Sequence, residues 1–341
     1  MKTLKMRRVW MILALMLMTV FISLDASLEQ EVCGESQNQD SCQAYGAHNS
    51  KDQDEELLRS IVDLDRYPIH QRGPSYDLLV EDCRRQLKAV GSVDLAGFIR
   101  QDVIEKMANE VDNLPSFNRL NLVSPYGASI DDEPPKINST LGGKSRQPHP
   151  SQRLFAQDTN AVAADQIPLN TLIRKVYDSE LVMNFIAHAT GKERMFHMED
   201  EFQAINIMYM YDGGSRAWHY DGTDTVVTLL LQKADTGGEY EFAPFIRGEE
   251  KGDERFEDVS KLFEGTYDGN IVKNADAGTL NLFNGIRSLH RVRAVYGPTK
   301  RIVAVLSYDS QPHKRGSHTK NVALYGERVE KIYKQRGLLS D

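Results

Sequence analysis

Residues 204–232 read AINIMYMYDGGSRAWHYDGTDTVVTLLLQ, and this stretch indicates the class of fold. Ala204 to Tyr211 is rich in strand-forming residues and ends at the turn signal Asp212-Gly213-Gly214. Thr225 to Gln232 is a run of leucines and β-branched residues that suits a buried strand. We therefore predict two strands, joined by a turn and a segment that carries a histidine and an aspartate.

Short apolar segments continue downstream, with glycine-containing turns between them. They are Glu239 to Phe245, Gly278 to Phe283, His290 to Tyr296 and Arg301 to Tyr308. Repeated short strands of this kind favour a jelly roll, and helical periodicity dominates the chain before them. We predict an α+β, mainly β fold: a double-stranded β-helix (jelly roll) with an N-terminal helical layer on one outer face.

His219 and Asp221 are two residues apart in an extended segment, so their side chains should point to the same side. The triplet alone is weak evidence: nine histidines and 49 acidic residues in 341 predict about one by chance (9 × 49/341). His290 strengthens it, because it lies 69 residues after Asp221 in a strand that a barrel can bring opposite. Two imidazoles and one carboxylate on one face are the ligands of non-haem iron(II) oxygenases.

A resemblance to a known superfamily rests on five segments of this sequence. They are Trp218 to Asp221, Val227 to Gln232, Gly237 to Phe242, Ser288 to Val292 and Arg301 to Tyr308. Together they resemble the core of iron(II)/2-oxoglutarate-dependent dioxygenases, over roughly residues 200 to 312. Within that superfamily the sequence is most similar to the group of free-amino-acid hydroxylases and radical halogenases. Its halogenases carry glycine where Asp221 stands here, so the resemblance favours hydroxylation.

The resemblance implies Fe(II), 2-oxoglutarate as cosubstrate, and O2. Arg301 follows His290 by 11 residues, after the Gly297-Pro298 turn, and its planar fork suits the far carboxylate of 2-oxoglutarate. Strand alternation puts Ser307 on the same face as Arg301. We also expect Asn206 and Tyr211 to point into the barrel as cosubstrate-binding residues.

The predicted substrate is a small amino-acid-like molecule. Arg216 is the candidate for binding a substrate carboxylate, Glu201 lies in an acidic cluster that suits an amine, and His197 is a candidate pocket residue. Two alternatives stay open. The first is a secretory-pathway hydroxylase of prolyl or lysyl residues in peptides. The second is a non-catalytic, metal-containing jelly-roll binding module.

The amino terminus carries a targeting pattern. A basic start precedes an uncharged apolar run from Val9 to Leu24, which predicts a signal peptide or signal-anchor over residues 1–26. The apolar run is short for a membrane span, which needs about 20 residues. From this pattern we expect the protein to be in the secretory pathway (the ER or Golgi lumen, or secreted), with or without a membrane tether. Cys33 and Cys42 then suit a small disulfide loop, and Asn138 begins a glycosylation sequon.

Composition sets the remaining boundaries. We predict a polar tether over residues 27–55, a helical support region over 56–200 with a long irregular loop (120–166), the oxygenase core over 201–312 and a basic tail or helix over 313–341. The net charge is -8, with no concentrated basic face carrying aromatics, so we expect no nucleic-acid partner.

Overall fold

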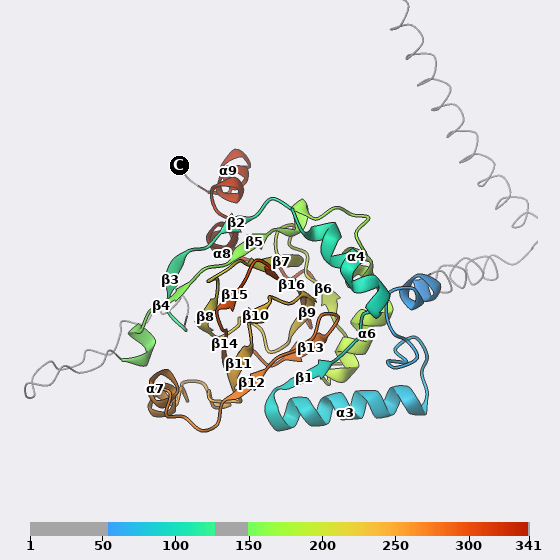
Figure 1. Ribbon diagram of the computed structural model, residues 1–341, viewed down its shortest axis with the longest axis horizontal. Coiled ribbons are helices and arrows are strands. Elements are labelled where there is room, and N and C mark those ends of the chain that lie inside the picture. Colours follow the sequence, from blue (N-terminus) through green and yellow to red (C-terminus); the bar gives the residue numbers. More distant parts are fainter. Residues whose placement is uncertain (1–53, 127–148, 340–341) are drawn as a thin grey trace, which may run out of the picture. The chain divides into compact units, whose positions relative to one another are not determined.

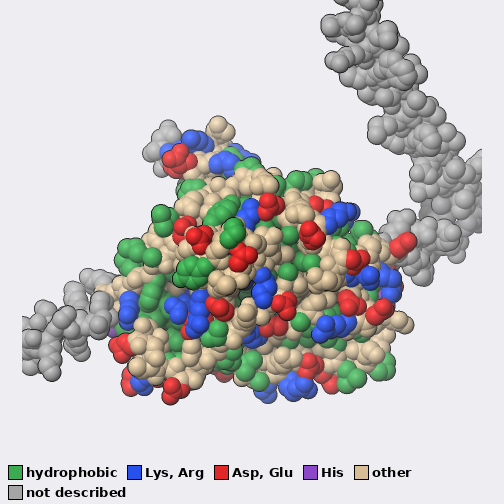
Figure 2. Space-filling model, viewed as in Figure 1, with side chains coloured by type: hydrophobic (Ala, Val, Ile, Leu, Met, Phe, Trp, Pro, Cys, Tyr) green, Lys and Arg blue, Asp and Glu red, His purple; other side chains and the backbone are tan. Residues whose placement is uncertain are grey.

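The computed structural model describes residues 54–126 and 149–339 (Figure 1). The predicted signal segment (1–26), nearly all of the tether, both tether cysteines and Asn138 lie outside the described residues. In the parts that are described, no helix has the length and apolar character needed to cross a membrane. Acidic and basic side chains are interspersed on the face drawn in Figure 2.

A seven-stranded antiparallel sheet forms one wall of the barrel. Its strands, in spatial order, are β1 (Ser92–Leu95), β13 (Leu280–Phe283), β9 (Val226–Gln232), β16 (Arg301–Leu306), β7 (Ile205–Met210), β5 (Asn160–Val162) and β2 (Phe117–Asn118). The two strands predicted within residues 204–232 are β7 and β9. They do not pair with each other, because β16 lies between them.

A four-stranded antiparallel sheet forms the second wall. Its order is β12 (Ile271–Lys273), β11 (Tyr240–Ala243), β14 (Leu289–Val292) and β8 (Arg216–His219). From β7 onward the chain passes repeatedly from one sheet to the other, which is the connectivity of a double-stranded β-helix. The mainly β, jelly-roll part of the prediction is therefore confirmed.

Three two-stranded pairs complete the β-structure of the described residues. They are β10 (Thr236–Gly237) with β15 (Val295–Tyr296), β17 (Tyr308–Asp309) with β6 (Phe196–His197), and β3 (Asn121–Val123) with β4 (Phe155–Gln157). The region expected to be helical support thus contains strands as well, and three of them extend the seven-stranded sheet at its two ends.

The helices precede, interrupt and follow the barrel strands (Figure 1). They are α3 (Pro74–Val90), α4 (Gln101–Val111), α5 (Leu172–Asp178), α6 (Glu180–Ala189), α7 (Phe256–Glu264), α8 (His318–Tyr325) and α9 (Glu327–Gln335). Helices α3 to α6 share one hydrophobic core with the seven-stranded sheet. The stretch predicted as a basic tail or helix contains two of the helices, and both contribute to a second, smaller core.

Strand alternation gives the seven-stranded sheet two different faces. On β16, Ile302, Ala304 and Leu306 lie in the core shared with the helices. Val303 and Val305 alternate with them and line a cavity between the two sheets. Because side chains on a strand alternate with a period of two, one sheet supplies both the packed core and one wall of the cavity.

Candidate metal centre

The two candidate histidine ligands are cross-strand neighbours in the four-stranded sheet. His290 on β14 pairs in register with His219 on β8, so both rings are on the same side of the sheet. Their ring centroids are 4.0 Å apart. Asp221 follows β8 by two residues, and its backbone N–H donates to the Gly285 carbonyl at 3.0 Å. These contacts bring three residues that are distant in sequence to one point.

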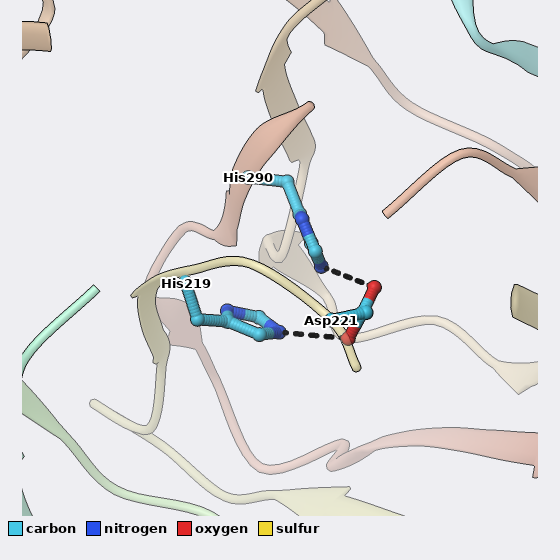
Figure 3. A group of neighbouring side chains, drawn as sticks. All are labelled: His219, Asp221 and His290. Carbon is cyan, nitrogen blue, oxygen red and sulfur yellow. Dashed lines mark ion pairs between the residues drawn. The ribbon is translucent and has the colours of Figure 1, made fainter. Parts of the chain in front are cut away.

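The ligand atoms of His219, Asp221 and His290 lie within 4.8 Å of one another (Figure 3). His219 Nε2 is 3.7 Å from Asp221 Oδ1, and His290 Nε2 is 3.2 Å from Asp221 Oδ2. Both imidazole rings direct Nε2 at the carboxylate (Figure 3). A single ion between them would contact all three side chains.

Hydrogen bonds to the backbone fix the tautomer of both rings. His219 Nδ1 is 2.7 Å from the Ala217 carbonyl oxygen, and His290 Nδ1 is 3.0 Å from that of Ser288. A carbonyl oxygen only accepts, so each Nδ1 must carry a proton and donate it. In a neutral ring this leaves a lone pair on Nε2, the arrangement common to metal-binding histidines. Burial lowers the pKa of His219 well below its usual value, which favours the neutral ring.

Asp221 completes the set as a carboxylate. Burial acts to raise its pKa, but His290 and His219, when they are protonated, and the guanidinium of Arg216 act to lower it and leave the pKa well below the usual range. Its Oδ2 is buried and accepts no hydrogen bond from the residues that the structure describes. Two imidazole lone pairs and a carboxylate that face one another repel unless a cation lies between them. The donor set fits iron(II).

Gly285 makes room for this carboxylate. A Cβ at Gly285 would overlap Asp221 Oδ2 and lie 2.6 Å from its Cγ. The backbone of Gly285 is not in the left-handed region, so close approach alone requires glycine here.

A β-bulge between β8 and β14 sets the direction of a further side chain. His290 pairs with His219, and Val292 pairs with Arg216. The step between these pairs is two residues on β14 and three on β8, so β8 has one extra residue. The bulge places Arg216 on the same side as His219, whereas strict alternation would have put it on the side of Trp218. Trp218 instead packs away from the cavity in a cluster with residues of α7.

The cavity beside the triad has a volume of about 410 Å³. This volume lies within the range of small-molecule sites. Its walls combine the three candidate ligands with apolar side chains from both sheets, among them Met208, Phe283 and Val303.

Arg301 enters this cavity from the start of β16. Its Nη1 is buried and has no hydrogen-bond partner among the described residues. Burial lowers the pKa of the guanidinium to about 10, so it stays charged at neutral pH. Gly238 accommodates the side chain, because a Cβ there would lie 3.0 Å from Arg301 Cδ. A buried, unpaired guanidinium is suited to a ligand carboxylate.

Two other predicted cosubstrate residues line the cavity but have protein partners. Ser307 Oγ donates to the Gln203 carbonyl at 2.7 Å. Asn206 Nδ2 donates to the same carbonyl at 3.2 Å, and Asn206 Oδ1 accepts from the Tyr325 hydroxyl. The placement of Tyr211 in the barrel was wrong: it is 47% exposed and does not line the cavity. Tyr211 is two residues after Tyr209, so the two side chains point to the same side of the strand. Tyr209 faces the core that the sheet shares with the helices.

Two predicted substrate contacts were also wrong. Glu201 forms an ion pair with Arg336, the residue that follows α9, and does not line the cavity. His197 is outside the cavity lining as well, because its ring packs against Tyr177 and its Nε2 is 2.7 Å from the Tyr177 carbonyl oxygen. Arg216 does line the cavity. Sequence reasoning missed Arg119, which lines it too and follows β2 where no periodic pattern marks it.

Comparisons with known proteins find likeness only among solved structures. No family model and no curated protein matches the chain. A 2OG-Fe(II) oxygenase family oxidoreductase from Burkholderia pseudomallei is 15% identical, with 71% of this chain and 93% of that chain covered and a TM-score of 0.43. The non-haem alpha-ketoglutarate-dependent epimerase SnoN from nogalamycin biosynthesis is 11% identical, with coverages of 68% and 83% and a TM-score of 0.45.

A prolyl-4-hydroxylase from Pseudomonas putida is 12% identical, with 66% of this chain and 96% of that chain covered and a TM-score of 0.36. Similarities this low assign no role to any residue of this chain. The functional conclusion therefore depends on the geometry of the cavity.

Proposed function

We propose that this chain is an Fe(II)- and 2-oxoglutarate-dependent oxygenase. Its proposed reaction is hydroxylation of an unactivated C–H bond in a small amino-acid-like substrate, with 2-oxoglutarate and O2 converted to succinate and CO2. The observation that carries the proposal is the convergence of two Nε2 lone pairs and a carboxylate, in one cavity with the Arg301 guanidinium, whose buried Nη1 has no hydrogen-bond partner among the described residues.

The residues divide the work by their chemistry. His219, Asp221 and His290 would hold the iron, and Arg301 would bind the far carboxylate of 2-oxoglutarate. Iron with 2-oxoglutarate and O2 supplies the oxidising power when bound. The carbonyls of Ala217 and Ser288 keep the two rings in the ligating tautomer.

The cavity walls favour chemistry that must be kept from water. Met208, Phe283, Val303 and Val305 line the space beside the triad. Apolar walls exclude bulk water and strengthen electrostatic interactions within the site. Asp221 itself favours hydroxylation over halogenation, because its carboxylate fills the position that is glycine in the halogenases the sequence resembles.

Succinate release tests this proposal. Protein loaded with Fe(II) and given 2-oxoglutarate, O2 and free amino acids should form succinate, and His290→Ala should abolish it. His313→Ala is the matched control, because His313 is exposed and outside the cavity. Full turnover in His290→Ala would remove His290 from the triad. A wild-type protein that binds the metal but never converts 2-oxoglutarate would favour the non-catalytic binding module.

We also propose that residues 1–26 direct the chain to the secretory pathway, as a cleaved signal or a membrane tether. The basic start and the apolar run from Val9 to Leu24 support this. Expression in secretory cells should give a protein whose mass falls on treatment with an amidase that removes N-linked glycans. The Asn138→Gln variant should show no such shift. A wild-type protein that remains in the cytosol would contradict the targeting proposal.

A further inference from the structure

The charges that line the cavity are unbalanced. Its lining contains six cationic side chains and two acidic ones, although the whole chain has a net charge of -8. The cations are Arg119, Arg216, Arg301, Lys314, Arg315 and Lys320, and the acids are Asp221 and Asp309. Asp221 is a candidate metal ligand, so its charge would be neutralised by the ion. One cation, Arg301, suffices for the cosubstrate carboxylate. The excess of positive charge therefore requires another explanation.

Two of these cations lie inside the cavity without an acidic partner. Arg119 Nε is buried and has no hydrogen-bond partner among the described residues. Arg216 donates to the side-chain oxygen of Gln157, a neutral acceptor. Within the described residues, neither guanidinium forms an ion pair with a carboxylate. Taking a charge out of water without a counter-charge is costly, so the pair is arranged for a ligand and not for stability.

The charge of Arg119 acts on Arg216, which lines the same cavity. Burial, followed by the charge of Arg119, lowers the pKa of Arg216 to about 9, and Asp221 acts in the opposite direction. Burial also lowers the pKa of Arg119. Arg216 therefore lies within electrostatic reach of both Arg119 and a candidate metal ligand. An anion bound to the two arginines would relieve their repulsion and hold its own molecule beside the metal centre.

This arginine pair is distinct from Arg301. Arg301 starts β16 in the seven-stranded sheet and lies against Gly238. Arg216 starts β8, the edge strand of the four-stranded sheet, and Arg119 follows β2, the edge strand of the seven-stranded sheet. The cavity thus offers two separate positions for an anion, and 2-oxoglutarate has only one carboxylate to place away from the metal.

We propose that Arg119 and Arg216 bind a compact oxyanion on the substrate, a carboxylate or a phosphate, so that the substrate is a small acid. The catalytic part of this inference rests on the proposed function, whereas anion binding by the pair does not. Guanidinium forks match both oxyanions in geometry. The exposed Lys314, Arg315 and Lys320 at the rim add positive potential that would draw such a substrate in. Interior residues of a peptide carry no such group on their backbone, so the pair disfavours a peptidyl substrate.

Anion binding is measured first, on the full chain loaded with redox-inert Zn(II) and saturated with 2-oxoglutarate. Sodium phosphate or sodium acetate is added at constant ionic strength against sodium chloride, and the melting temperature is recorded. We expect a saturable rise in the wild type with at least one anion. The rise should be at least tenfold weaker in apparent affinity for Arg119→Gln. Arg85→Ala is the matched control, because Arg85 is exposed and pairs with Asp82 on α3.

The outcomes separate the possible explanations. A response to phosphate alone indicates a phosphate ester, and a response to acetate indicates a carboxylic acid. No rise with either anion, or an equal rise in Arg119→Gln, overturns the inference. Arg119→Gln should also fold and melt no lower than the wild type without added anion, because the buried Nε of Arg119 has no hydrogen bond to lose within residues 54–126 and 149–339. If Zn(II) and 2-oxoglutarate fail to bind but phosphate still stabilises through Arg119, the proposed function falls and anion binding stands.

Turnover gives the second measurement. Free amino acids are compared with their C-terminal amides, and phosphorylated amino acids with their unphosphorylated forms, for succinate release above the substrate-free rate. We expect a preference of at least tenfold for molecules with the free oxyanion, lost in Arg119→Gln. The Arg85→Ala control should keep both the preference and the substrate-free rate of the wild type, because Arg85 is exposed and pairs with Asp82. Equal stimulation with and without the oxyanion in both comparisons overturns the inference and leaves the proposed function in place.

Discussion

Replacing Arg301 tests whether the buried guanidinium is built for the cosubstrate. Its Nη1 has no hydrogen-bond partner among the described residues, and burial lowers the pKa of the side chain to about 10. The positive charge of Arg301 in this position is suited to an anionic group of a bound ligand. Arg301→Ala should therefore remove affinity for 2-oxoglutarate while leaving the metal ligands intact.

The expected loss follows from the burial of the pair. Removing one partner of a buried, hydrogen-bonded charge pair costs about 2–5 kcal/mol. At about 1.4 kcal/mol for each factor of ten, the dissociation constant should rise roughly 30- to 4,000-fold. Arg301→Lys keeps the charge but not the planar fork, so its loss should lie between wild type and alanine. The Arg301→Ala variant should lose only the stability that comes from the packing contacts of the side chain. Its free energy of unfolding should fall by no more than that contribution.

Calorimetric titration of 2-oxoglutarate into Zn(II)-loaded protein measures these constants. Arg85→Ala controls for the change in net charge, since Arg85 is exposed on α3. An Arg301→Ala dissociation constant within threefold of the wild type would refute the reasoning. A loss of affinity for Zn(II) in the same variant would show that Arg301 supports the metal ligands instead.

Three other substitutions or modifications test separate parts of the structure. Gly285→Ala should weaken metal binding at least tenfold in a folded protein, because the new methyl group would displace the Asp221 carboxylate. Gly222→Ala, with only a flexible lysine 3.6 Å from its Cβ, should bind metal normally. Cys83 should resist thiol reagents at pH 8 until the protein unfolds, because burial raises its pKa to about 12. Glu241→Gln should lower the free energy of unfolding by about 1–3 kcal/mol, since the 4% exposed carboxylate accepts from two arginines.

Each of these results has a measurement and a contrary outcome. If calorimetry shows that Gly285→Ala and Gly222→Ala bind Zn(II) with equal affinity, the close approach of Gly285 to Asp221 is contradicted. Rapid labelling of native Cys83, followed by mass spectrometry, would contradict its burial. Urea unfolding of Glu241→Gln at wild-type stability would show that the ion pairs contribute nothing net.

Cys83 also affects stability at high pH. An unfolded thiol titrates near pH 9, whereas the folded one keeps its proton to about pH 12. Between these values the unfolded state binds fewer protons than the folded state, so stability attributable to Cys83 falls as pH rises. A Cys83→Ser variant should lose less stability than the wild type between pH 8.5 and 10, and an equal loss would contradict this account.

Local periodicity predicted the parts of the site that lie on regular strands. His219 and Asp221 share a face because they are two residues apart, and the same rule places Val303, Val305 and Ser307 with Arg301 in the cavity. Applied with the same care, it would have excluded Tyr211, which is five residues from Asn206 and so has the opposite parity. The jelly roll followed from repeated short strands and glycine turns, which are local signals.

The rest depended on contacts that no local pattern encodes. The side on which Arg216 lies is decided by a bulge against β14, visible only once the two strands are paired. Arg119 reaches the cavity from an irregular segment after an edge strand. Glu201 and His197 are close in sequence to β7, but ion pairing with Arg336 and packing on Tyr177 hold them elsewhere. Tertiary contacts therefore determine which polar residues line the cavity.

The central claim is that three side chains bind one ferrous ion, and anaerobic calorimetric titration with Fe(II) tests it most directly. We predict one Fe(II) per wild-type chain, with binding weakened at least a hundredfold in each of His219→Ala, Asp221→Ala and His290→Ala. The His313→Ala control should bind as the wild type does. Wild-type affinity and stoichiometry in any one of the three ligand variants would contradict the account.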